Sequence, residues 1–225
     1  APVNGIQAAD HNDPYEGFNR KMFAFSTSVD RAVLQPVARG YGKIPEPPRK
    51  GVRNFVRNLA EPVTLANDIL QGKPKFAMGT LSRFVINSTL GLLGFVDVAT
   101  DFGIMRHRED FGEALGVWGV GAGPYIFAPI LGPLPPRDLV GFLVDLVSNP
   151  LVWIGDPVAG HLNTGRYLAD GLDTRERALG TVEELEATSI DYYASVRSLY
   201  RQSREFQIRD GEVQYDELPD FDEFE

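Results

Sequence analysis

ALGVWGVGAGPYIFAPILGPLPP, from Ala114 to Pro136, decides the fold class because it is apolar yet unsuited to a straight helix. Its 23 uncharged residues would suffice to cross a bilayer as a helix. Five of them are glycine and five are proline. At about 1 kcal/mol per glycine and about 3 kcal/mol per interior proline, a continuous helix would be destabilised by roughly 20 kcal/mol. The eight Leu, Ile, Val and Phe residues would return only about 3 to 5 kcal/mol on insertion. The segment must therefore bend, as the floor of a soluble core or as the wall of a cavity at membrane depth.

The segments on both sides of this stretch show helical spacing. Asp13, Pro14 and Glu16 together predict a helix N-terminus, with Asp13 as the N-cap, and this helix should end before Pro36. Apolar residues at intervals of three and four predict the other helices. These helices cover about 52–59, 62–70, 73–90, 136–148 and 157–179, and two more begin at a Thr181–Glu184 capping box and at Ser189. No segment alternates like a strand over more than a few residues, so we predict an all-α fold.

Charge is concentrated at the C-terminal end of the chain. The net charge of the 225 residues is −9, and residues 210–225 hold eight acidic residues and no Lys or Arg. The remaining 22 basic and 23 acidic residues nearly balance, which leaves no basic footprint for nucleic acid. Without cysteine, disulfides and thiolate zinc sites are excluded. We expect a flexible lead-in without a signal peptide over residues 1–12, one helical domain over 13–209 and a disordered acidic tail over 210–225.

The sequence shows no motif for catalysis or for cofactor binding. The three histidines are scattered and have no carboxylate or second histidine at ligand spacing, which disfavours a metal site. The glycine-rich run over residues 119–124 follows no strand, so it is better explained by turn geometry than by a nucleotide-binding loop. Nucleophile-elbow, zinc-protease and phosphate-loop patterns do not occur. The histidines are His11, His107 and His161.

The helix predicted after Pro136 is unusually apolar, and its polar side is narrow. That side comprises Asp138, Gly141, Asp145 and Ser148, which share one helical face. About 10 Å of helix separates Asp138 from Asp145, too far for a shared proton. Two interpretations stay open: a solvated face of a surface helix, or a charged stripe facing an aqueous lumen. The second would also suit Arg83 with Asn87, and Arg166.

Four sequence blocks occur in order along residues 13–206. They are DPYEGFNR at 13–20; NLAEP at 58–62 with LQG at 70–72; RFVIN at 83–87 with Gly91, Gly94 and DVA at 97–99; and FG at 111–112 with LG at 115–116, GVGAGPY at 119–125 and Pro129. Together they resemble the VacJ/MlaA family of outer-membrane lipoproteins. The family's lipid-anchoring N-terminal cysteine is missing here, and we expect that the anchor was removed from this chain.

The resemblance implies a single ring-like bundle of amphipathic helices in the inner, periplasmic leaflet of the outer membrane, with a central amphipathic channel. It also implies association with a trimeric porin, removal of misplaced phospholipid from the outer leaflet, and delivery to a soluble periplasmic carrier. Members of the family are not enzymes, and no cofactor is implied. The candidates for contact with lipid in the channel are Arg83, Asn87, Asp97, Gly121, Gly123, Pro124, Tyr125, Asp138, Asp145 and Arg166.

Two other functions are compatible with the sequence. One is a structural lipoprotein that binds porins without transporting lipid, and the other is a soluble all-α enzyme that acts on a small amphiphile. Because a charged-stripe helix follows the opening segment directly, we favour the conduit. We expect residues 119–136 to form a bent ridge at the mouth of the channel, with Tyr125 at the lipid–water boundary.

Overall fold

The computed structural model describes residues 13–211 and confirms the all-α class, with one short β-hairpin. The predicted lead-in and nearly all of the predicted acidic tail lie outside the described residues. The elements are α1 (Glu16–Val29), a π-helical turn η2 (Asp30–Leu34), α2 (Gln35–Tyr41), α3 (Glu46–Asn58), α4 (Glu61–Leu70), α5 (Pro74–Thr89), α6 (Val98–Asp101), α7 (Phe111–Val117), β1 (Phe127–Ala128), β2 (Gly132–Pro133), α8 (Pro136–Ser148), α9 (Pro150–Trp153), α10 (Pro157–Arg177), α11 (Leu179–Thr188) and α12 (Tyr192–Ile208).

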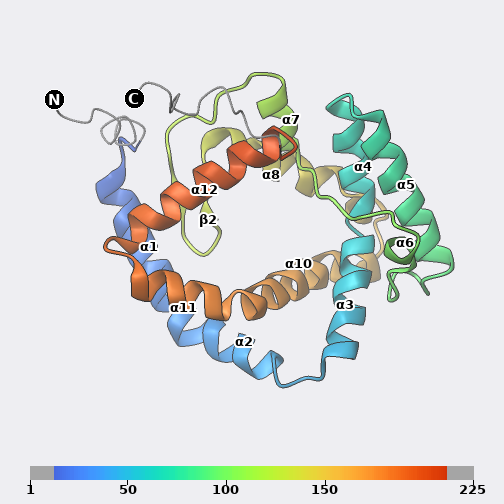
Figure 1. Ribbon diagram of the computed structural model, residues 1–225, viewed down its shortest axis with the longest axis horizontal. Helices are drawn as coiled ribbons and strands as arrows, with labels where there is room; N and C mark the ends of the chain where they lie inside the picture. The colour runs from blue at the N-terminus through green and yellow to red at the C-terminus, as the bar shows by residue number, and fades with distance from the viewer. Residues whose placement is uncertain (1–12, 212–225) are drawn as a thin grey trace, which may run out of the picture.

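The helices follow one another around a ring (Figure 1). The long helix α10 contacts α2 and α3 on one side of the ring, while α4 packs on α5 and α7 packs on α8 on the other. The last helix, α12, contacts both α7 and α11. Arg20 of α1 binds Asp191, just before α12, so the ring closes between the two ends of the chain, as the family resemblance implies.

The start of the first helix differs from the prediction. Asp13 is not an N-cap: α1 begins at Glu16, and Asp13 instead accepts hydrogen bonds from Asn19 (2.7 Å), Arg197 (2.9 Å) and the Tyr193 hydroxyl. A local capping pattern is thus overridden by partners about 180 residues away.

The predicted end of this helix before Pro36 is also wrong. Helical structure continues to Tyr41 because η2 precedes the proline, and the N–H of Gln35 donates to the carbonyl of Asp30 five residues earlier. A π-helical turn changes the hydrogen-bond register, so the missing N–H of proline does not end the helix.

The predicted starts of the last two helices also need correction. The Thr181–Glu184 capping box is absent: α11 begins at Leu179, with Ala178 at the N-cap and no side-chain cap. The final helix begins at Tyr192 rather than Ser189, because the Asp191 carboxylate caps it by accepting from the N–H of Ala194 (3.1 Å).

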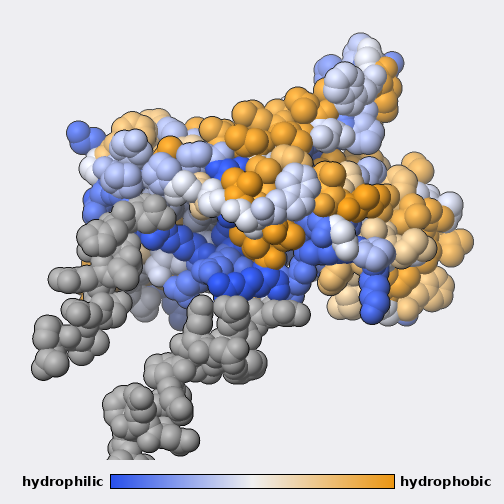
Figure 2. All heavy atoms as spheres, turned by 90° about the horizontal axis from the view of Figure 1, so that it is seen from above, coloured by the Kyte–Doolittle hydropathy of each residue, from blue (hydrophilic) through white to orange (hydrophobic). Residues whose placement is uncertain are grey.

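The usual distribution of polar and apolar side chains is inverted. Among the described residues, nine hydrophobic side chains are buried against 18 polar or charged ones, while 41 large hydrophobic side chains are exposed. Figure 2 shows hydrophobic surface over the upper part and the right-hand end of the view, with a hydrophilic band below. None of the helices in residues 13–211 is both long and apolar enough to cross a membrane. Exposed apolar area on this scale marks a surface that meets lipid or protein.

The segment that opened the sequence analysis is bent, as predicted. After α7 it has no helix until α8, and Gly119 and Gly132 both have φ of +85°, a region that favours glycine. The side chain of Asn19 ties this segment to α1 by donating to the carbonyl of Tyr125 and accepting from the N–H of Phe127, both at 2.9 Å. The expected position of Tyr125 at a lipid–water boundary is wrong, since its side chain is 1% exposed and packs with Phe127 and Tyr193.

Helices α7 and α8 make the closest backbone contact in this region. A Cβ atom on Gly141 of α8 would lie 2.3 Å from the backbone nitrogen of Gly112 on α7. This contact leaves no room for a side chain at position 141. It holds α8, which carries Asp138 and Asp145, directly against α7.

Candidate functional site

A cavity of about 510 Å³ lies within the ring. Its wall combines α3, α4, the loop before α7, β2, α8, α10 and α12, so that segments from most of the chain contribute. The lining residues are Val56, Arg57, Ala60, Val63, Thr64, Arg106, Arg108, Glu109, Asp110, Pro133, Leu134, Asp138, Phe142, Asp145, Arg166, Tyr167, Asp170, Thr174, Arg177, Tyr200 and Arg204. The wall is amphipathic, since charged groups alternate with aliphatic and aromatic ones.

Several arginines of this wall are poorly neutralised. Among residues 13–211, no carboxylate lies within ion-pair distance of the guanidinium of Arg57 or of Arg166. Burial lowers the pKa of Arg57, and the charges of Arg106 and Arg177 lower it further. Burial likewise lowers the pKa of Arg166, which donates to Asn163 (3.1 Å) and to the Tyr167 hydroxyl (2.8 Å).

Arg106 is the third arginine of this group. Its nearest acid is Glu61, at 3.5 Å, and its buried Nε has no hydrogen-bond partner. Burial lowers the pKa of Arg106 as well. Arginine stays protonated in proteins, so these side chains keep their charge at an energetic cost. An anion in the cavity would lower the energetic cost of keeping these arginines charged. We use the name arginine group for Arg57, Arg106 and Arg166.

The two predicted aspartates of α8 both line the cavity rather than a solvated outer face. Asp145 accepts from Asn67 (2.9 Å) and from the N–H of Phe111 (3.0 Å), and burial raises its pKa. Burial also opposes ionisation of Asp138, but hydrogen bonds from Arg137 and Tyr200 and the charge of Arg204 hold its pKa below the ordinary value. The two carboxyls thus have opposite pKa shifts within one wall.

Arg204 of α12 joins three acids at the edge of the cavity. It contacts Asp110 at 2.6 Å, Glu113 at 2.7 Å and Asp138 at 3.0 Å. Burial and the charge of Asp110 raise the pKa of Glu113 to about 8. This cluster fastens α12 to α7 and α8 and so closes one side of the ring.

Three other predicted residues do not line the central cavity and form a hydrogen-bonded cluster of their own. Arg83 donates to Asp97 (2.9 Å) and Thr100 (3.1 Å), and Asn87 donates to Asp97 (3.0 Å). Asn87 also accepts from the N–H of Ala99 (2.9 Å). None of the three predicted residues lines the central cavity. In this structure Arg83 and Asn87 of α5 hold the loop around α6.

The predicted residues of the bent segment divide into two groups. Gly123 and Tyr125 line a second cavity of about 380 Å³, beside the C-terminal half of α12. Gly121 and Pro124 line neither cavity. Of the ten candidates, the central cavity therefore brings together only Asp138, Asp145 and Arg166.

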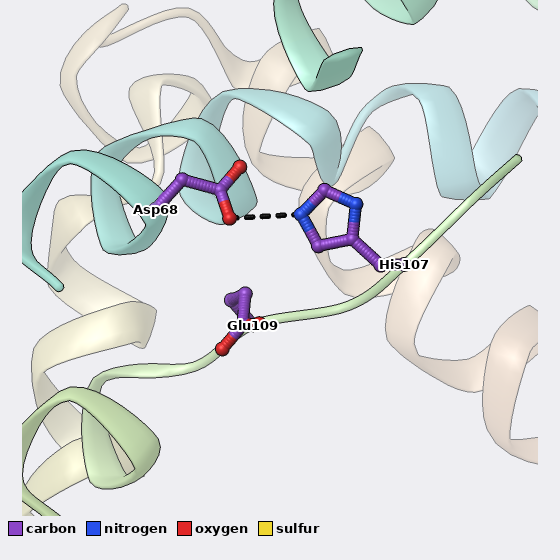
Figure 3. Close-up of side chains that lie close together, drawn as sticks. All are labelled: Asp68, His107 and Glu109. Atoms are coloured by element: carbon purple, nitrogen blue, oxygen red, sulfur yellow. Dashed lines mark hydrogen bonds and ion pairs between the residues drawn. The ribbon is translucent and has the colours of Figure 1, made fainter. Parts of the chain in front are cut away.

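Asp68, His107 and Glu109 come together beside the cavity, a cluster that the sequence did not reveal (Figure 3). Their candidate ligand atoms lie within 4.8 Å of one another. His107 Nε2 is 2.8 Å from Asp68, and Glu109 accepts from Gln71 at 2.7 Å.

The other partners of this cluster argue against a metal site. The hydroxyl of Thr80 donates to Asp68 (2.6 Å), and the ammonium of Lys73 lies 3.4 Å from Glu109, where it supplies the positive charge that a metal would otherwise bring. The cluster therefore fits a hydrogen-bonded anchor of the loop on α4 and α5 better than a metal site.

Of the arginine group, Arg166 was a candidate from the sequence, whereas Arg57 and Arg106 were missed. Arg57 belongs to an ordinary amphipathic helix, and Arg106 belongs to a loop. Only the run Arg106-His107-Arg108 could have drawn attention, since three adjacent basic or titratable side chains are uncommon in a nearly neutral chain.

Comparisons with known proteins agree with this architecture. The family model described as MlaA lipoprotein matches residues 11–207. The "Intermembrane phospholipid transport system lipoprotein MlaA" of Haemophilus influenzae is 37% identical, over 95% of this chain and 87% of its own length, and that of Escherichia coli K12 is 36% identical, over 96% and 86%. A solved structure described as "Structural basis for maintenance of bacterial outer membrane lipid asymmetry" superposes with a TM-score of 0.78 at 35% identity, over 87% of this chain and 98% of that one. This chain belongs to the MlaA lipoprotein family.

Proposed function

We propose that this chain is the outer-membrane component of an intermembrane phospholipid transport system and that phospholipid passes through the central cavity. One observation carries the proposal: among the described residues, 41 large hydrophobic side chains are exposed, while charged side chains make up much of the wall of a cavity within the ring. This distribution suits a protein that is surrounded by lipid tails and conducts a polar headgroup. The names of the similar proteins support the same function.

The cavity wall suits the two parts of a phospholipid differently. The arginine group attracts the phosphate, because an anion would offset three charges that the protein neutralises only in part. Val56, Phe142 and other apolar residues of the wall offer contact for the first carbons of the acyl chains. The acids of α8 add repulsion, which keeps the phosphate from binding too tightly to leave.

The surroundings of the ring follow from the same proposal. A protein with an apolar exterior and no described helix long enough to span is suited to lie within one leaflet, which we take to be the periplasmic leaflet of the outer membrane. Part of the exposed apolar surface would contact lipid, and another part would bind a trimeric porin. The family resemblance supports removal of misplaced phospholipid from the outer leaflet and its delivery to a soluble periplasmic carrier, without any hydrolysis.

The test uses a strain that lacks the gene, complemented with variants, and measures phospholipid in the outer leaflet. Arg57→Gln with Arg166→Gln should leave outer-leaflet phospholipid close to the level of the deletion strain. Arg39→Gln is the matched control, because Arg39 is exposed and pairs with Glu183 away from the cavity; it should restore the barrier. Thermal unfolding in detergent checks that all variants fold.

Two results would contradict the proposal. Full complementation by the double variant would show that transport does not need Arg57 and Arg166. A deletion strain with a normal outer leaflet would exclude transport itself and would favour a structural lipoprotein that binds porins.

A further inference from the structure

The wall of the central cavity carries unpaired charges of both signs. Arg57 and Arg166 have no carboxylate within ion-pair distance among residues 13–211. Asp145 and Asp170 line the same cavity, and in this part of the chain neither has a cation within ion-pair distance. Opposite charges attract each other more strongly inside a protein than in bulk water. Their separation within one cavity therefore needs a physical cause.

Neutral hydrogen-bond partners hold Arg166 and Asp145 in place. Arg166 donates to Asn163 (3.1 Å) and to the Tyr167 hydroxyl (2.8 Å), and its guanidinium lies 4.3 Å from the centre of the Tyr167 ring. On α8, Asp145 accepts from a side-chain amide and a backbone N–H. The wall therefore keeps its two signs of charge apart, as a ligand that carries both would require.

Asp170 is the acid that acts on the whole arginine group. It lies on α10 four residues after Arg166, and both line the cavity, so they share one face about 6 Å apart along the axis. Burial lowers the pKa of each member of the arginine group, and the charge of Asp170 offsets part of this lowering in all three. Its half-buried carboxylate has no hydrogen-bond partner among residues 13–211. Asp170 is therefore near these guanidinium groups and still able to accept hydrogen bonds.

A zwitterionic headgroup has the charge pattern that this wall complements. Phosphate accepts hydrogen bonds from guanidinium groups, and a primary ammonium donates to a carboxylate. In an ethanolamine headgroup a short linker joins the phosphate to the ammonium, at a separation close to one helical turn. We propose that the central cavity prefers phospholipids whose headgroup carries a primary ammonium, with Asp170 as the acceptor for that ammonium. The phosphate then accepts from Arg57 and Arg166. This inference rests on the proposed function and names its class of phospholipid.

An anionic headgroup fits the same wall less well. A glycerol headgroup offers Asp170 only neutral hydroxyl groups, and the carboxylate repels the negative charge of its phosphate. A hydrogen bond that joins charged groups is roughly twice as strong as one between neutral groups. The ethanolamine headgroup gains such a bond at Asp170 and the glycerol headgroup does not.

The test compares two soluble short-chain lipids, dihexanoylphosphatidylethanolamine and dihexanoylphosphatidylglycerol. Calorimetry measures their binding to the full chain in nonionic detergent, and injection into detergent alone gives the heat of mixing. The unsubstituted chain should bind the ethanolamine lipid about tenfold more tightly, the effect of one hydrogen bond between charged groups.

Asp170→Asn keeps the size of the side chain and removes its charge. It should abolish the preference, because the ethanolamine lipid loses its charged acceptor and the glycerol lipid loses a repulsion. Asp101→Asn is the matched control, since Asp101 is exposed on α6 and does not line the cavity; it should keep the preference. Thermal unfolding in the same detergent checks that both variants fold.

Two results would overturn the inference. Equal affinities of the unsubstituted chain for the two lipids would exclude the preference, and this measurement needs no variant. An equal rise in the affinity of Asp170→Asn for both lipids would show that the carboxylate only opposes the arginine group and binds no ammonium.

Free phosphoethanolamine identifies the source of the headgroup. It should bind more weakly than the ethanolamine lipid because it has no acyl chains, and equal or tighter binding would contradict a lipid site. None of these results depends on the outer-leaflet assay. Equal lipid affinities would refute the preference while transport stands, and a normal outer leaflet in the deletion strain would refute transport whatever headgroup the cavity prefers.

Discussion

Gly141→Ala tests the contact that sets the position of α8 in the cavity wall. The new Cβ would lie 2.3 Å from the nitrogen and 2.6 Å from the Cα of Gly112, where ordinary contacts begin at 3.4 Å. Since the opposing atoms are backbone, α7 and α8 would have to separate by about 1 Å. Such overpacking costs about 1 to 3 kcal/mol, near the upper value where backbone must move. The helical preference of alanine over glycine returns about 1 kcal/mol.

The expected net loss is therefore about 2 kcal/mol of unfolding free energy, or a fall of about 4 to 8 °C in melting temperature for a domain of this size. Circular dichroism during heating in detergent measures it. Gly171→Ala in α10 is the matched control: no atom lies within 4 Å of its Cβ position, so the same substitution should raise the melting temperature by about 2 to 4 °C. If Gly141→Ala raises it as much as Gly171→Ala does, the close packing of α7 on α8 is refuted.

Three further predictions concern charge. Arg204→Met should lower the unfolding free energy in denaturant titrations by about 3 to 5 kcal/mol, because it leaves three acids without their common partner; a loss under 1 kcal/mol would contradict this. Asp13, Asp97 and Asp138 have pKa values held below the ordinary value by hydrogen bonds and arginines that outweigh burial. Their stabilisation is complete above about pH 4 and is lost as the pH falls through the lowered values, so melting temperatures should drop steeply below pH 4, and a flat profile would argue against these pairings. EDTA should leave the melting temperature unchanged because the ligand atoms around His107 already have protein partners, whereas a fall would indicate a bound metal.

The helices were predictable where local signals and packing agree. The helix expected over 73–90 is found as Pro74–Thr89, because Lys73-Pro74 and Gly91 mark ends that no distant residue overrides. The predicted start of the first helix was wrong, because contacts with residues far away in the sequence determine the position of Asp13. Asp13 shows the pattern of an N-cap, but residues of α12 take its carboxylate. Sequence spacing gives no information about a contact between residues so far apart in the chain.

The residues of the cavity wall were likewise predictable only in part, because the tertiary fold decides which polar side chains come together. For the narrow polar stripe of α8 the sequence left a solvated face and a lumen-facing stripe both open. Asp138 and Asp145 of that stripe line the cavity, whereas Gly141 packs on Gly112. The lumen interpretation was extended to Arg83 and Asn87 of α5, but these residues bind the loop around α6, because a buried loop needs polar partners just as a cavity does. The arginine group depends on how the ring brings α3, α10 and a loop together, which no single segment records.

The contacts between the start of α1 and the start of α12, which we call the clasp, have a consequence for how the chain folds. Asp13 and Arg20 near the start of α1 bind Tyr193, Arg197 and Asp191 near the start of α12, across 171 to 184 residues of sequence. Contacts of such separation form late and slowly, because a long loop must close before they contribute. During synthesis α1 emerges long before α12, so the ring stays open until nearly the whole chain exists. Amide exchange during refolding should therefore show the amides around this clasp as the last to gain protection.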